Sequence, residues 1–360
     1  MKKGDVIAMA AGGTGGHFFP AQALAEELLE HGYKPLLICD QRTNEFLRGG
    51  LAKIDSLKIF APKPGKSAIS NALNFLKLIP VVFRLARLFK DKGVVAVVGF
   101  GGYPSFPALM AALRLRIPIY THEQNAVVGR VNRTFLPFAS KLFLSFPHTT
   151  KLPAKHAHKS IVVGNLVRKS VLSFSQNKIA DHNSFNILVI GGSQGAKIFS
   201  DVVPFSIKLL PEELQTRLKI HQQARNNLVM ETKRLYKATK SQVEVRGFFE
   251  NIGELMANAD LIICRSGAST VTEIAIMGKP AIFIPLKIAT DNHQYYNAKL
   301  LSDAGGAIII DESSLTAELL ATTLAEILSS PKRMQGMAKK SGKMAILGAA
   351  EKIRKAMGAI

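Results

Sequence analysis

The sequence predicts an α/β protein built from two doubly wound, Rossmann-like domains that face each other across a cleft. Short apolar runs rich in Val, Ile and Leu alternate with helical patterns throughout, which is typical of parallel strands buried on both faces by crossover helices. At 360 residues, the chain is long for one core and comfortable for two. Two glycine-rich loops, half a chain apart, indicate one nucleotide-type domain in each half.

Each glycine-rich loop directly follows an apolar run. Val6–Ala11 leads into Gly12-Gly13-Thr14-Gly15-Gly16-His17, and Ile187–Ile190 leads into Gly191-Gly192-Ser193-Gln194-Gly195-Ala196. A strand, a glycine turn and a helix start place several backbone N–H groups around one small volume, which favours an anion. The first loop is neither a Walker A loop nor a complete G-x-G-x-x-G, because Phe18 occupies the last glycine position. Neither ATP hydrolysis nor dinucleotide redox chemistry is therefore favoured.

The strands can be placed in order along the chain. In the first half we expect them near Asp5–Ala11, Lys34–Cys39, Val94–Gly99, Pro118–Thr121 and Lys141–Leu144. In the second half we expect them near Asn186–Gly191, Leu218–His221, Gln242–Arg246, Leu261–Cys264, Ala281–Pro285 and Ala307–Ile310. The polar stretch Ser173–Ser184 separates the halves, and we expect the boundary near Gly164–Leu166. The domains would then span residues 1–164 and 165–344, with an amphipathic helix at 345–357 that could pack on either one.

The composition is globular but strongly basic. Hydrophobic residues make up 47% and charged residues 20% of the chain, and 47 Lys+Arg against 26 Asp+Glu give a formal net charge of +21. Such a field attracts polyanions, either nucleic acid or an anionic membrane surface. A basic background that serves solubility alone explains the charge equally well.

Other features of the sequence indicate a cytoplasmic protein. The N-terminus lacks the apolar region of a signal peptide, and no apolar stretch reaches the ~18 residues of a spanning helix. Cys39 and Cys264 each end an apolar run and are expected to be buried in a reducing compartment. No metal-type cysteine or histidine cluster is visible.

Almost every unusual residue follows a predicted strand, where open parallel sheets bind their ligands. In the first half, His17 enters the cleft at the mouth of a helix, and Gly99–Pro104 indicates close approach of a ligand. His122–Asn125 is either a buried structural network or a site for a polar ligand such as a sugar. In the second half the corresponding segments are Gly191–Gly195, Arg265–Thr270 and Pro285–Gln294.

The second half favours a phosphorylated ligand. Ser193 and Arg168 could contact a phosphate, and Arg265–Thr270 precedes a helix expected over Val271–Met277, whose N-terminus attracts anions. Glu273, expected in the first turn of this helix, either matches the helix dipole or grips two ribose hydroxyls. Asp291-Asn292-His293-Gln294 offers donors and acceptors for sugar hydroxyls. Because no Asp-x-Asp pair occurs, a Mg²⁺ or Mn²⁺ clamp is not indicated.

Leu73–Phe89 carries apolar residues at helical spacing, including Phe75, Ile79 and Phe83, while Lys77, Arg84 and Arg87 share another face. This is either an ordinary core helix with a solvated face or a surface suited to the membrane interface.

Four motifs together closely resemble the MurG family, the bacterial N-acetylglucosaminyltransferases that convert lipid I to lipid II. They are Gly-Gly-Thr-Gly-Gly-His at 12–17, His-Glu-Gln-Asn at 122–125, Gly-Gly-Ser-Gln-Gly-Ala at 191–196, and Cys264–Glu273. The resemblance covers nearly the whole chain and implies the two-domain GT-B glycosyltransferase fold. It also implies a donor, UDP-GlcNAc, held mainly by the C-terminal domain. The N-terminal domain would bind the lipid-linked acceptor, and the last helix would pack back on it.

The resemblance assigns roles residue by residue. Phe248 and Phe249 match the segment that contacts uracil, Glu273 the ribose-binding glutamate, Ser193 and Arg168 diphosphate contacts, and Gln294 a reader of GlcNAc hydroxyls. His293 stands where some members have a second glutamine, and Leu166 where many have proline. Further expected UDP-GlcNAc contacts are Thr14, Gly15, Gly16, Asn125, Ser269 and Thr270. Residues expected to face the acceptor or the membrane are Tyr103, Phe75, Ile79, Phe83, Arg84 and Arg87.

The implied reaction is a metal-independent, inverting transfer without a cofactor. The MurNAc 4-hydroxyl of undecaprenyl-diphosphate-MurNAc-pentapeptide would attack C1 of GlcNAc as UDP departs, giving lipid II for peptidoglycan synthesis. His17 is the first candidate for the base that takes the hydroxyl proton, and Glu123 is the second. The protein would act peripherally on the cytoplasmic face of the cell membrane, with anionic phospholipid and other cell-wall synthesis proteins as partners.

Three alternatives stay open at this point. A UDP-GlcNAc 2-epimerase on the same fold would need no lipid acceptor. A basic nucleic-acid-binding protein would use the +21 charge, although no recognition-helix, RNP or zinc signature is present. A catalytically silent membrane scaffold would leave the polar residues at the strand ends without a role.

Overall fold

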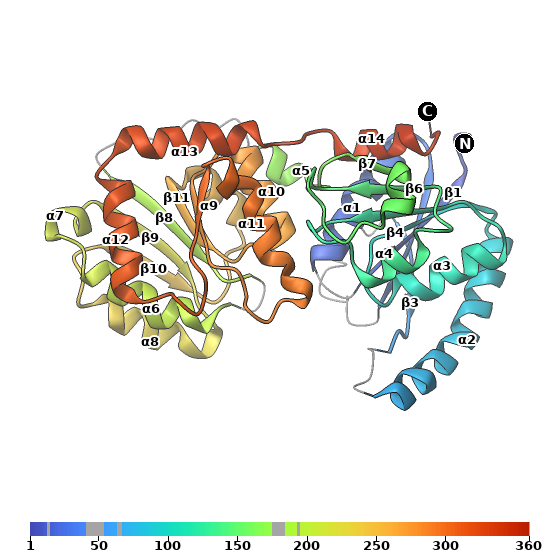
Figure 1. The fold of residues 1–360 in the computed structure, drawn as a ribbon, viewed down its shortest axis with the longest axis horizontal. Coiled ribbons are helices and arrows are strands. Elements are labelled where there is room, and N and C mark those ends of the chain that lie inside the picture. The colour runs from blue at the N-terminus through green and yellow to red at the C-terminus, as the bar shows by residue number, and fades with distance from the viewer. Residues whose placement is uncertain (13–14, 41–53, 63–66, 175–183, 193–194, 360) are drawn as a thin grey trace. The chain divides into compact units, whose positions relative to one another are not determined.

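The computed structural model describes residues 1–12, 15–40, 54–62, 67–174, 184–192 and 195–359 (Figure 1). They divide into two compact units, the first formed by Met1–Arg168 with Ile346–Ile360 and the second by Lys169–Ala345. Each unit contains one sheet whose strand pairs are all parallel. The prediction of two Rossmann-like α/β units is confirmed. The division follows Arg168 instead of Gly164, so Arg168 belongs to the first unit.

The first unit has a seven-stranded sheet in the order β3-β2-β1-β4-β5-β6-β7. Its strands are β1 Val6–Ala11, β2 Lys34–Asp40, β3 Asp55–Ile59, β4 Val94–Gly99, β5 Ile119–Glu123, β6 Lys141–Leu144 and β7 Ser160–Val162. Its helices are α1 Gly15–Glu30, α2 Ala68–Asp91, α3 Ser105–Arg114, α4 Arg130–Phe135 and α14 Ala349–Ala356, with a 3₁₀ helix at Ala154–Lys159.

Both faces of this sheet are buried, which is why its strands read as continuous apolar runs. Along β1, Ile7 and Met9 join one core cluster with residues of α1 and α14. Ala8 and Ala10 alternate with them and join a second cluster with residues of α2 and α3. Successive side chains of a strand point to opposite faces, so the helix pairs cover the two sides of the sheet.

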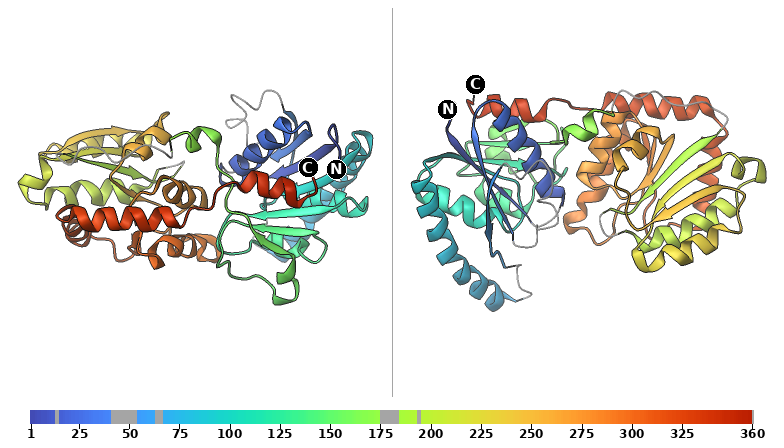
Figure 2. Two further views of the ribbon diagram at one scale, coloured as in Figure 1. Left: turned by 90° about the horizontal axis from the view of Figure 1, so that it is seen from above. Right: turned by 180° about the vertical axis from the view of Figure 1, so that it is seen from behind.

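The C-terminal segment returns to the first unit and packs beside α1 (Figure 2). Arg354 of α14 is buried, and its Nε lies 2.8 Å from Glu27 Oε1 of α1. The same guanidinium donates to the Ala359 carbonyl at 2.8 Å, and the N-terminal ammonium donates to the Gly358 carbonyl at 3.0 Å. The last helix is shorter than residues 345–357, because Gly348, with φ at +73°, precedes its first turn.

The second unit has a six-stranded sheet in the order β10-β9-β8-β11-β12-β13. Its strands are β8 Phe185–Ile190, β9 Leu218–Gln223, β10 Gln242–Arg246, β11 Leu261–Cys264, β12 Ala281–Phe283 and β13 Ala307–Ile309. Its helices are α5 Lys169–Leu172, α6 Lys197–Lys208, α7 Glu212–Gln215, α8 Val229–Tyr236, α9 Ile252–Asn258, α10 Ala268–Met277, α11 His293–Asp303, α12 Ala317–Leu328 and α13 Pro331–Lys343. Short 3₁₀ helices span Asn226–Leu228 and Thr290–Asn292.

Every strand predicted from the sequence is present, and no end differs from its predicted position by more than two residues. Two edge strands, β3 and β7, were not predicted. β3 reads Asp-Ser-Leu-Lys-Ile and is largely exposed, and β7 has only three residues, so neither forms a buried apolar run. Both cysteines are buried and unpaired, as expected.

The strand order fixes where a ligand meets each sheet. It reverses between β1 and β4 in the first unit and between β8 and β11 in the second. Ligands of doubly wound sheets bind outside the carboxyl ends of the strands at such points. Within the described ranges, no helix combines the length and apolar character needed to cross a membrane.

Candidate functional site

His17 lies in the first turn of α1, and its imidazole packs against glycines of two loops. A Cβ added to Gly12 would lie 3.3 Å from His17 Nδ1, and one added to Gly101 would lie 3.6 Å from His17 Cδ2. Gly101 and Gly102 have φ of +75° and +72°, which side-chain-bearing residues rarely adopt. The glycines after β1 and β4 therefore make the space that the imidazole occupies.

Ser105 fixes this pair of loops. Its Oγ lies 2.7 Å from the carbonyl oxygens of both Ala10 and Gly101 and donates its single proton between them. The Phe100 N–H donates to the same Ala10 carbonyl at 2.9 Å. The end of β1 and the loop after β4 are thus held together around His17.

His122, at the end of β5, forms a buried neutral network. Its Nδ1 accepts from Gln124 Nε2 at 3.0 Å, and its Nε2 faces the Gly164 carbonyl at 3.4 Å and Ser145 Oγ at 3.5 Å. These partners favour the tautomer with the proton on Nε2. Burial lowers the pKa of His122 to about 4, although the bond to Gly164 opposes the shift. For His122 and Gln124, a buried structural network is therefore the better interpretation.

Glu123 follows His122 and is buried as well. Its carboxylate accepts from Gly129 N at 2.7 Å, Asn132 Nδ2 at 2.8 Å, Asn125 N at 3.1 Å and Asn125 Nδ2 at 3.3 Å. Burial raises the pKa of Glu123, and these four hydrogen bonds reduce the shift without reversing it. Glu123 and Asn132 together shape the segment between β5 and α4. Asn125, half-buried, lies at the margin of this network.

Arg168 is the last residue of the first unit's main segment and packs against the N-terminal part of α1. Its guanidinium stacks 4.4 Å from the centroid of the Phe19 ring. A Cβ added to Gly15 would lie 2.9 Å from the Phe19 ring, so glycine is needed for this packing. Gly16 is exposed, and so is Tyr103, in the loop after β4.

α2 presents apolar side chains to solvent. Its C-terminal half packs through Leu85 and Phe89, and its N-terminal half extends beyond the sheet (Figure 1). Leu76, Ile79 and Phe83 are 58%, 41% and 52% exposed, and Arg84 and Arg87 are exposed beside them. The helix therefore has an apolar face that packs on the core and a second apolar face that is exposed. An ordinary core helix needs only the first.

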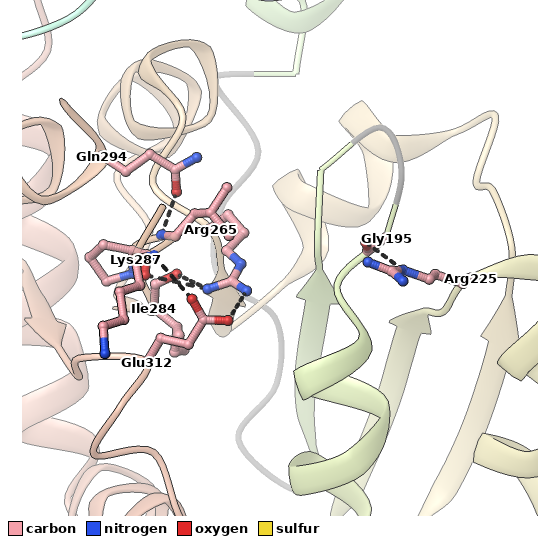
Figure 3. Close-up of polar contacts among 9 residues, drawn as sticks. Gly195, Arg225, Arg265, Ile284, Lys287, Gln294 and Glu312 are labelled. Carbon is pink, nitrogen blue, oxygen red and sulfur yellow. Dashed lines mark hydrogen bonds and ion pairs between the residues drawn. The ribbon is translucent and has the colours of Figure 1, made fainter. Parts of the chain in front are cut away.

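In the second unit, the glycines that follow β8 are closely constrained. Gly192 and Gly195 have φ of +83° and +67°, and a Cβ on Gly191 would overlap the Ala196 nitrogen. Arg225, in the loop after β9, donates through Nε to the Gly195 carbonyl at 3.4 Å (Figure 3). Ser193, predicted in this loop, lies outside the described residues, as does Thr14 of the first glycine loop.

The N-terminus of α10 carries unsatisfied hydroxyls. The Oγ atoms of Ser266 and Ser269 are buried, and within the described residues neither has a hydrogen-bond partner. Thr270 is half-buried in the first turn. The helix begins at Ala268 and not at Val271, because Gly267 is its N-cap, so Glu273 lies in the second turn. That position weakens the explanation of Glu273 as a dipole-matching residue, since the dipole acts within the first turn.

Arg265 connects three loops of this unit (Figure 3). Its side chain is almost fully buried; Nη1 donates to the carbonyls of Ile284 and Pro285 at 3.0 and 3.4 Å, and Nη2 to Glu312 Oε1 at 2.6 Å. Burial raises the pKa of Glu312, but the hydrogen bonds from Arg265 and the Lys287 N–H outweigh it and hold the pKa below its ordinary value.

His293 and Gln294 begin α11. Asp291 and Asn292, both with φ of +54°, turn the chain into this helix. His293 Nδ1 donates to the Thr290 carbonyl at 2.8 Å, which leaves Nε2 as an acceptor, and Gln294 Oε1 accepts from Leu286 N at 2.9 Å. Gln294 therefore contacts the loop that Arg265 fixes, whereas His293 contacts the turn just before its own helix.

The two phenylalanines differ in exposure. Phe248 is 69% exposed, whereas Phe249 is buried, with Arg246 5.8 Å from its ring centroid. Only Phe248 offers a free ring to a ligand.

Most of the predicted donor and catalytic residues that the structure describes thus lie at or beyond the carboxyl ends of the strands within each unit, whereas Ile79, Phe83, Arg84 and Arg87 lie on α2. Glu312 and Asn132 were missed. Glu312 follows β13 and could have been found by the strand-end rule, whereas nothing in the sequence signals Asn132, which is on α4. In the described part of the chain, no three His, Cys, Asp or Glu side chains are grouped so as to hold a metal ion.

Comparisons with known proteins agree with this architecture. The N-terminal domain model of glycosyltransferase family 28 matches residues 7–144, and the C-terminal domain model matches residues 186–355. The chain is 41% identical over 357 residues to the UDP-N-acetylglucosamine--N-acetylmuramyl-(pentapeptide) pyrophosphoryl-undecaprenol N-acetylglucosamine transferase of Phenylobacterium zucineum, covering 98% of this chain and 97% of that protein. The protein of the same name in Rickettsia bellii is 40% identical, covering 94% of each chain. The crystal structure of Acinetobacter baumannii MurG superimposes with a TM-score of 0.82 at 31% identity, covering 99% of this chain and 100% of that chain.

The neutral state of His122 predicts a pH dependence of stability. The folded-state pKa of about 4 lies below the ordinary value of 6.5, so the unfolded chain binds the proton first as pH falls. The contribution of neutral His122 to the free energy of unfolding is fully present above pH 6.5. It is lost as the pH falls towards 4, and the loss is on the order of 3 kcal/mol. Urea unfolding followed by circular dichroism at several pH values measures the loss.

A His122→Gln variant should lose this part of the pH dependence, and the exposed His158→Gln variant should keep it. The comparison isolates His122. The raised pKa of Glu123 changes stability with pH in the opposite direction, but Glu123 is present in all three proteins, so its contribution cancels. Equal pH profiles for all three proteins would contradict the assignment.

Proposed function

The chain belongs to glycosyltransferase family 28, and from this we propose that it transfers GlcNAc from UDP-GlcNAc to lipid I. The acceptor is the 4-hydroxyl of MurNAc in undecaprenyl-diphosphate-MurNAc-pentapeptide, and the product is lipid II for peptidoglycan synthesis. The observation that carries the proposal is the alignment, over nearly the full length of both chains, with relatives named for this transfer. The two glycine loops and the polar strand ends supply the chemistry it needs.

The second unit is proposed to hold the donor. The N-terminus of α10 offers backbone N–H groups and the unsatisfied hydroxyls of Ser266 and Ser269 to a diphosphate. Glu273 would accept from two ribose hydroxyls, and the exposed ring of Phe248 would contact uracil, with Phe249 supporting it from the core. Ser193 and Thr270 would complete the phosphate contacts of this unit. Arg168, the last residue of the first unit's main segment, keeps its predicted role as a further diphosphate contact.

The sugar is proposed to meet neutral groups. Gln294 Oε1 is already held by Leu286 N, which leaves its Nε2 to donate to a GlcNAc hydroxyl. His293 Nε2 would accept from a neighbouring hydroxyl. Charge that develops on departing UDP would be stabilised by the helix N-terminus and Arg168, without a metal ion.

The first unit is proposed to hold the acceptor and the catalytic base. The Glu123 carboxylate already accepts four hydrogen bonds from the protein. His17, which is half-exposed at the glycine loops, is therefore the better candidate for the base. As the MurNAc oxygen attacks C1 of GlcNAc, its proton passes to His17 and the C1–O bond to UDP breaks with its electron pair on UDP. Attack opposite the leaving group gives the β-linked product. Tyr103 would line the acceptor side, whereas Gly15, Gly16 and Asn125 keep their predicted role as contacts of UDP-GlcNAc.

Membrane attachment is proposed to occur through α2. Its exposed apolar side chains Leu76, Ile79 and Phe83 lie beside Arg84 and Arg87, a combination that suits the headgroup region of an anionic bilayer. The side chain of Phe75, predicted to share this role, lies outside the described set. This surface would bring the enzyme to its lipid-linked acceptor at the cytoplasmic face of the membrane.

The first test is transfer of labelled GlcNAc from UDP-GlcNAc to a short-chain lipid I analogue in the presence of EDTA. We expect a β-linked disaccharide lipid that forms only when the acceptor is present, since no metal clamp is proposed. Appearance of epimerised sugar without any disaccharide would instead favour the 2-epimerase alternative. Retention on DNA that falls with salt, without transfer, would favour the nucleic-acid alternative.

Replacement of His17 tests the base. We expect His17→Ala to lower kcat by about 10²- to 10⁴-fold, the usual contribution of a general base, while UDP binding stays near wild type. His31→Ala removes a half-exposed histidine just after the same helix and should leave kcat unchanged. Near-normal turnover by His17→Ala would remove His17 from the role of base.

Replacement of two arginines tests the membrane surface. The double variant Arg84→Gln/Arg87→Gln should bind vesicles containing anionic phospholipid roughly thirtyfold more weakly, at about 1 kcal/mol for each cation. The control Lys332→Gln/Lys339→Gln removes two exposed cations from α13 and should bind as wild type. Equal weakening of both variants would mean that overall charge, and not the α2 surface, binds the vesicle.

A further inference from the structure

Glu312, in the loop after β13, has no role in the transfer described so far, yet it joins two loops of the second unit. One carboxylate oxygen, Oε1, accepts from Arg265 Nη2 at 2.6 Å, and the other, Oε2, accepts from the Lys287 N–H at 3.0 Å (Figure 3). The side chain is 23% exposed. Both oxygens are therefore engaged within the protein, one by a side chain and one by backbone.

Arg265 extends this contact to the loop after β12. Its side chain is 10% exposed, and Nη1 donates to the Ile284 and Pro285 carbonyls at 3.0 and 3.4 Å. Its guanidinium lies 5.3 Å from the ring centroid of Phe199 in α6, which limits its movement. The ion pair of Arg265 and Glu312 thus binds the backbone of Ile284, Pro285 and Lys287.

The same loop holds Gln294. The Leu286 N–H, between the groups bound by Arg265 and Glu312, donates to Gln294 Oε1 at 2.9 Å. Within the described residues, Gln294 Nε2 has no hydrogen-bond partner and is directed away from the loop (Figure 3). The position of this amide therefore depends on the position of the Leu286 N–H.

We propose that Glu312 is a positioning residue for the sugar part of the donor, acting through Arg265 and the loop Ile284–Lys287 on Gln294. The inference rests on the proposed function, in which Gln294 Nε2 donates to a hydroxyl of GlcNAc. Glu312 itself touches neither sugar nor nucleotide. Its two oxygens fix the loop that orients the Gln294 amide before the donor binds. The amide then loses little conformational entropy on binding.

This role separates sugar recognition from nucleotide recognition. Phosphate and ribose contacts are proposed at α10 and the glycine loop, whereas among the described residues Glu312 bonds to Arg265 and Lys287. Loss of Glu312 should therefore weaken binding of UDP-GlcNAc and leave binding of UDP unchanged. A general folding defect would weaken both.

The experiment is a double-mutant cycle on the full-length protein, read by isothermal titration calorimetry with UDP-GlcNAc and with UDP. We expect Glu312→Ala and Gln294→Ala each to weaken UDP-GlcNAc binding roughly fivefold to tenfold, the loss of about one hydrogen bond. In the Gln294→Ala background, Glu312→Ala should add less than about twofold, because the two residues act in one chain of contacts. UDP binding should change less than about twofold in every variant.

A conservative variant and a matched control sharpen the result. Glu312→Gln keeps one oxygen acceptor but turns an N–H₂ group towards the other donor, so its UDP-GlcNAc affinity should fall between wild type and Glu312→Ala. Glu326→Ala breaks another Glu–Arg pair of the same unit, 2.9 Å from Arg333 but exposed, and should bind both ligands as wild type.

Independent, multiplicative losses from Glu312→Ala and Gln294→Ala would overturn the proposal, and so would equal weakening of UDP and UDP-GlcNAc by Glu312→Ala. Failure of the wild-type protein to bind UDP-GlcNAc would instead refute the proposed function. The two failures are therefore distinguishable.

Discussion

The parallel sheet buried on both faces is the constraint on which the rest of each unit depends. Apolar side chains must cover both sides of β1 and β8, so their strands leave no room for polar chemistry along their length. Polar groups are confined to the loops at the strand ends, and the reversal of strand order opens a space between two of those loops. In the first unit that space holds the His17 imidazole against Gly12 and Gly101.

The two units stabilise their loops by different means. The first uses neutral and hydrogen-bonded groups: a neutral His122, and a Glu123 carboxylate that four N–H donors surround. The second uses an ion pair between Arg265 and Glu312 that spans three loops. A buried pair of this kind is weak evidence for added stability, because desolvation offsets its attraction. Its value here is geometric, since it sets where the loop after β12 lies.

The sequence predicted the fold well because burial on two faces leaves a strong signal. Runs such as Val94–Gly99 and Leu261–Cys264 have no competing helical interpretation, and both strands have the predicted bounds. β3 and β7 were not predicted, because edge strands are partly exposed and carry polar residues, such as Asp55 and Lys58 in β3. The residues next to the glycine loops could be singled out because each loop follows a buried strand; their roles stay predictions. The position of Glu312 after β13 could have marked it by the strand-end rule, but its pairing with Arg265, 47 residues away, leaves no local pattern.

Glu123 and Glu312 show why residue type alone does not assign a role. Glu123 ends β5 and Glu312 follows β13, and both carboxylates bond to groups within the protein. Burial dominates at Glu123 and raises its pKa, because its partners are neutral amides. At Glu312 a guanidinium and a backbone N–H outweigh burial and lower the pKa. The ionised carboxylate of Glu312, paired with a buried cation, holds two loops in place. The carboxylate of Glu123, surrounded by amides, holds the turn between β5 and α4. Neither is free to take a proton from a substrate, which supports the proposal that the half-exposed imidazole of His17 does so.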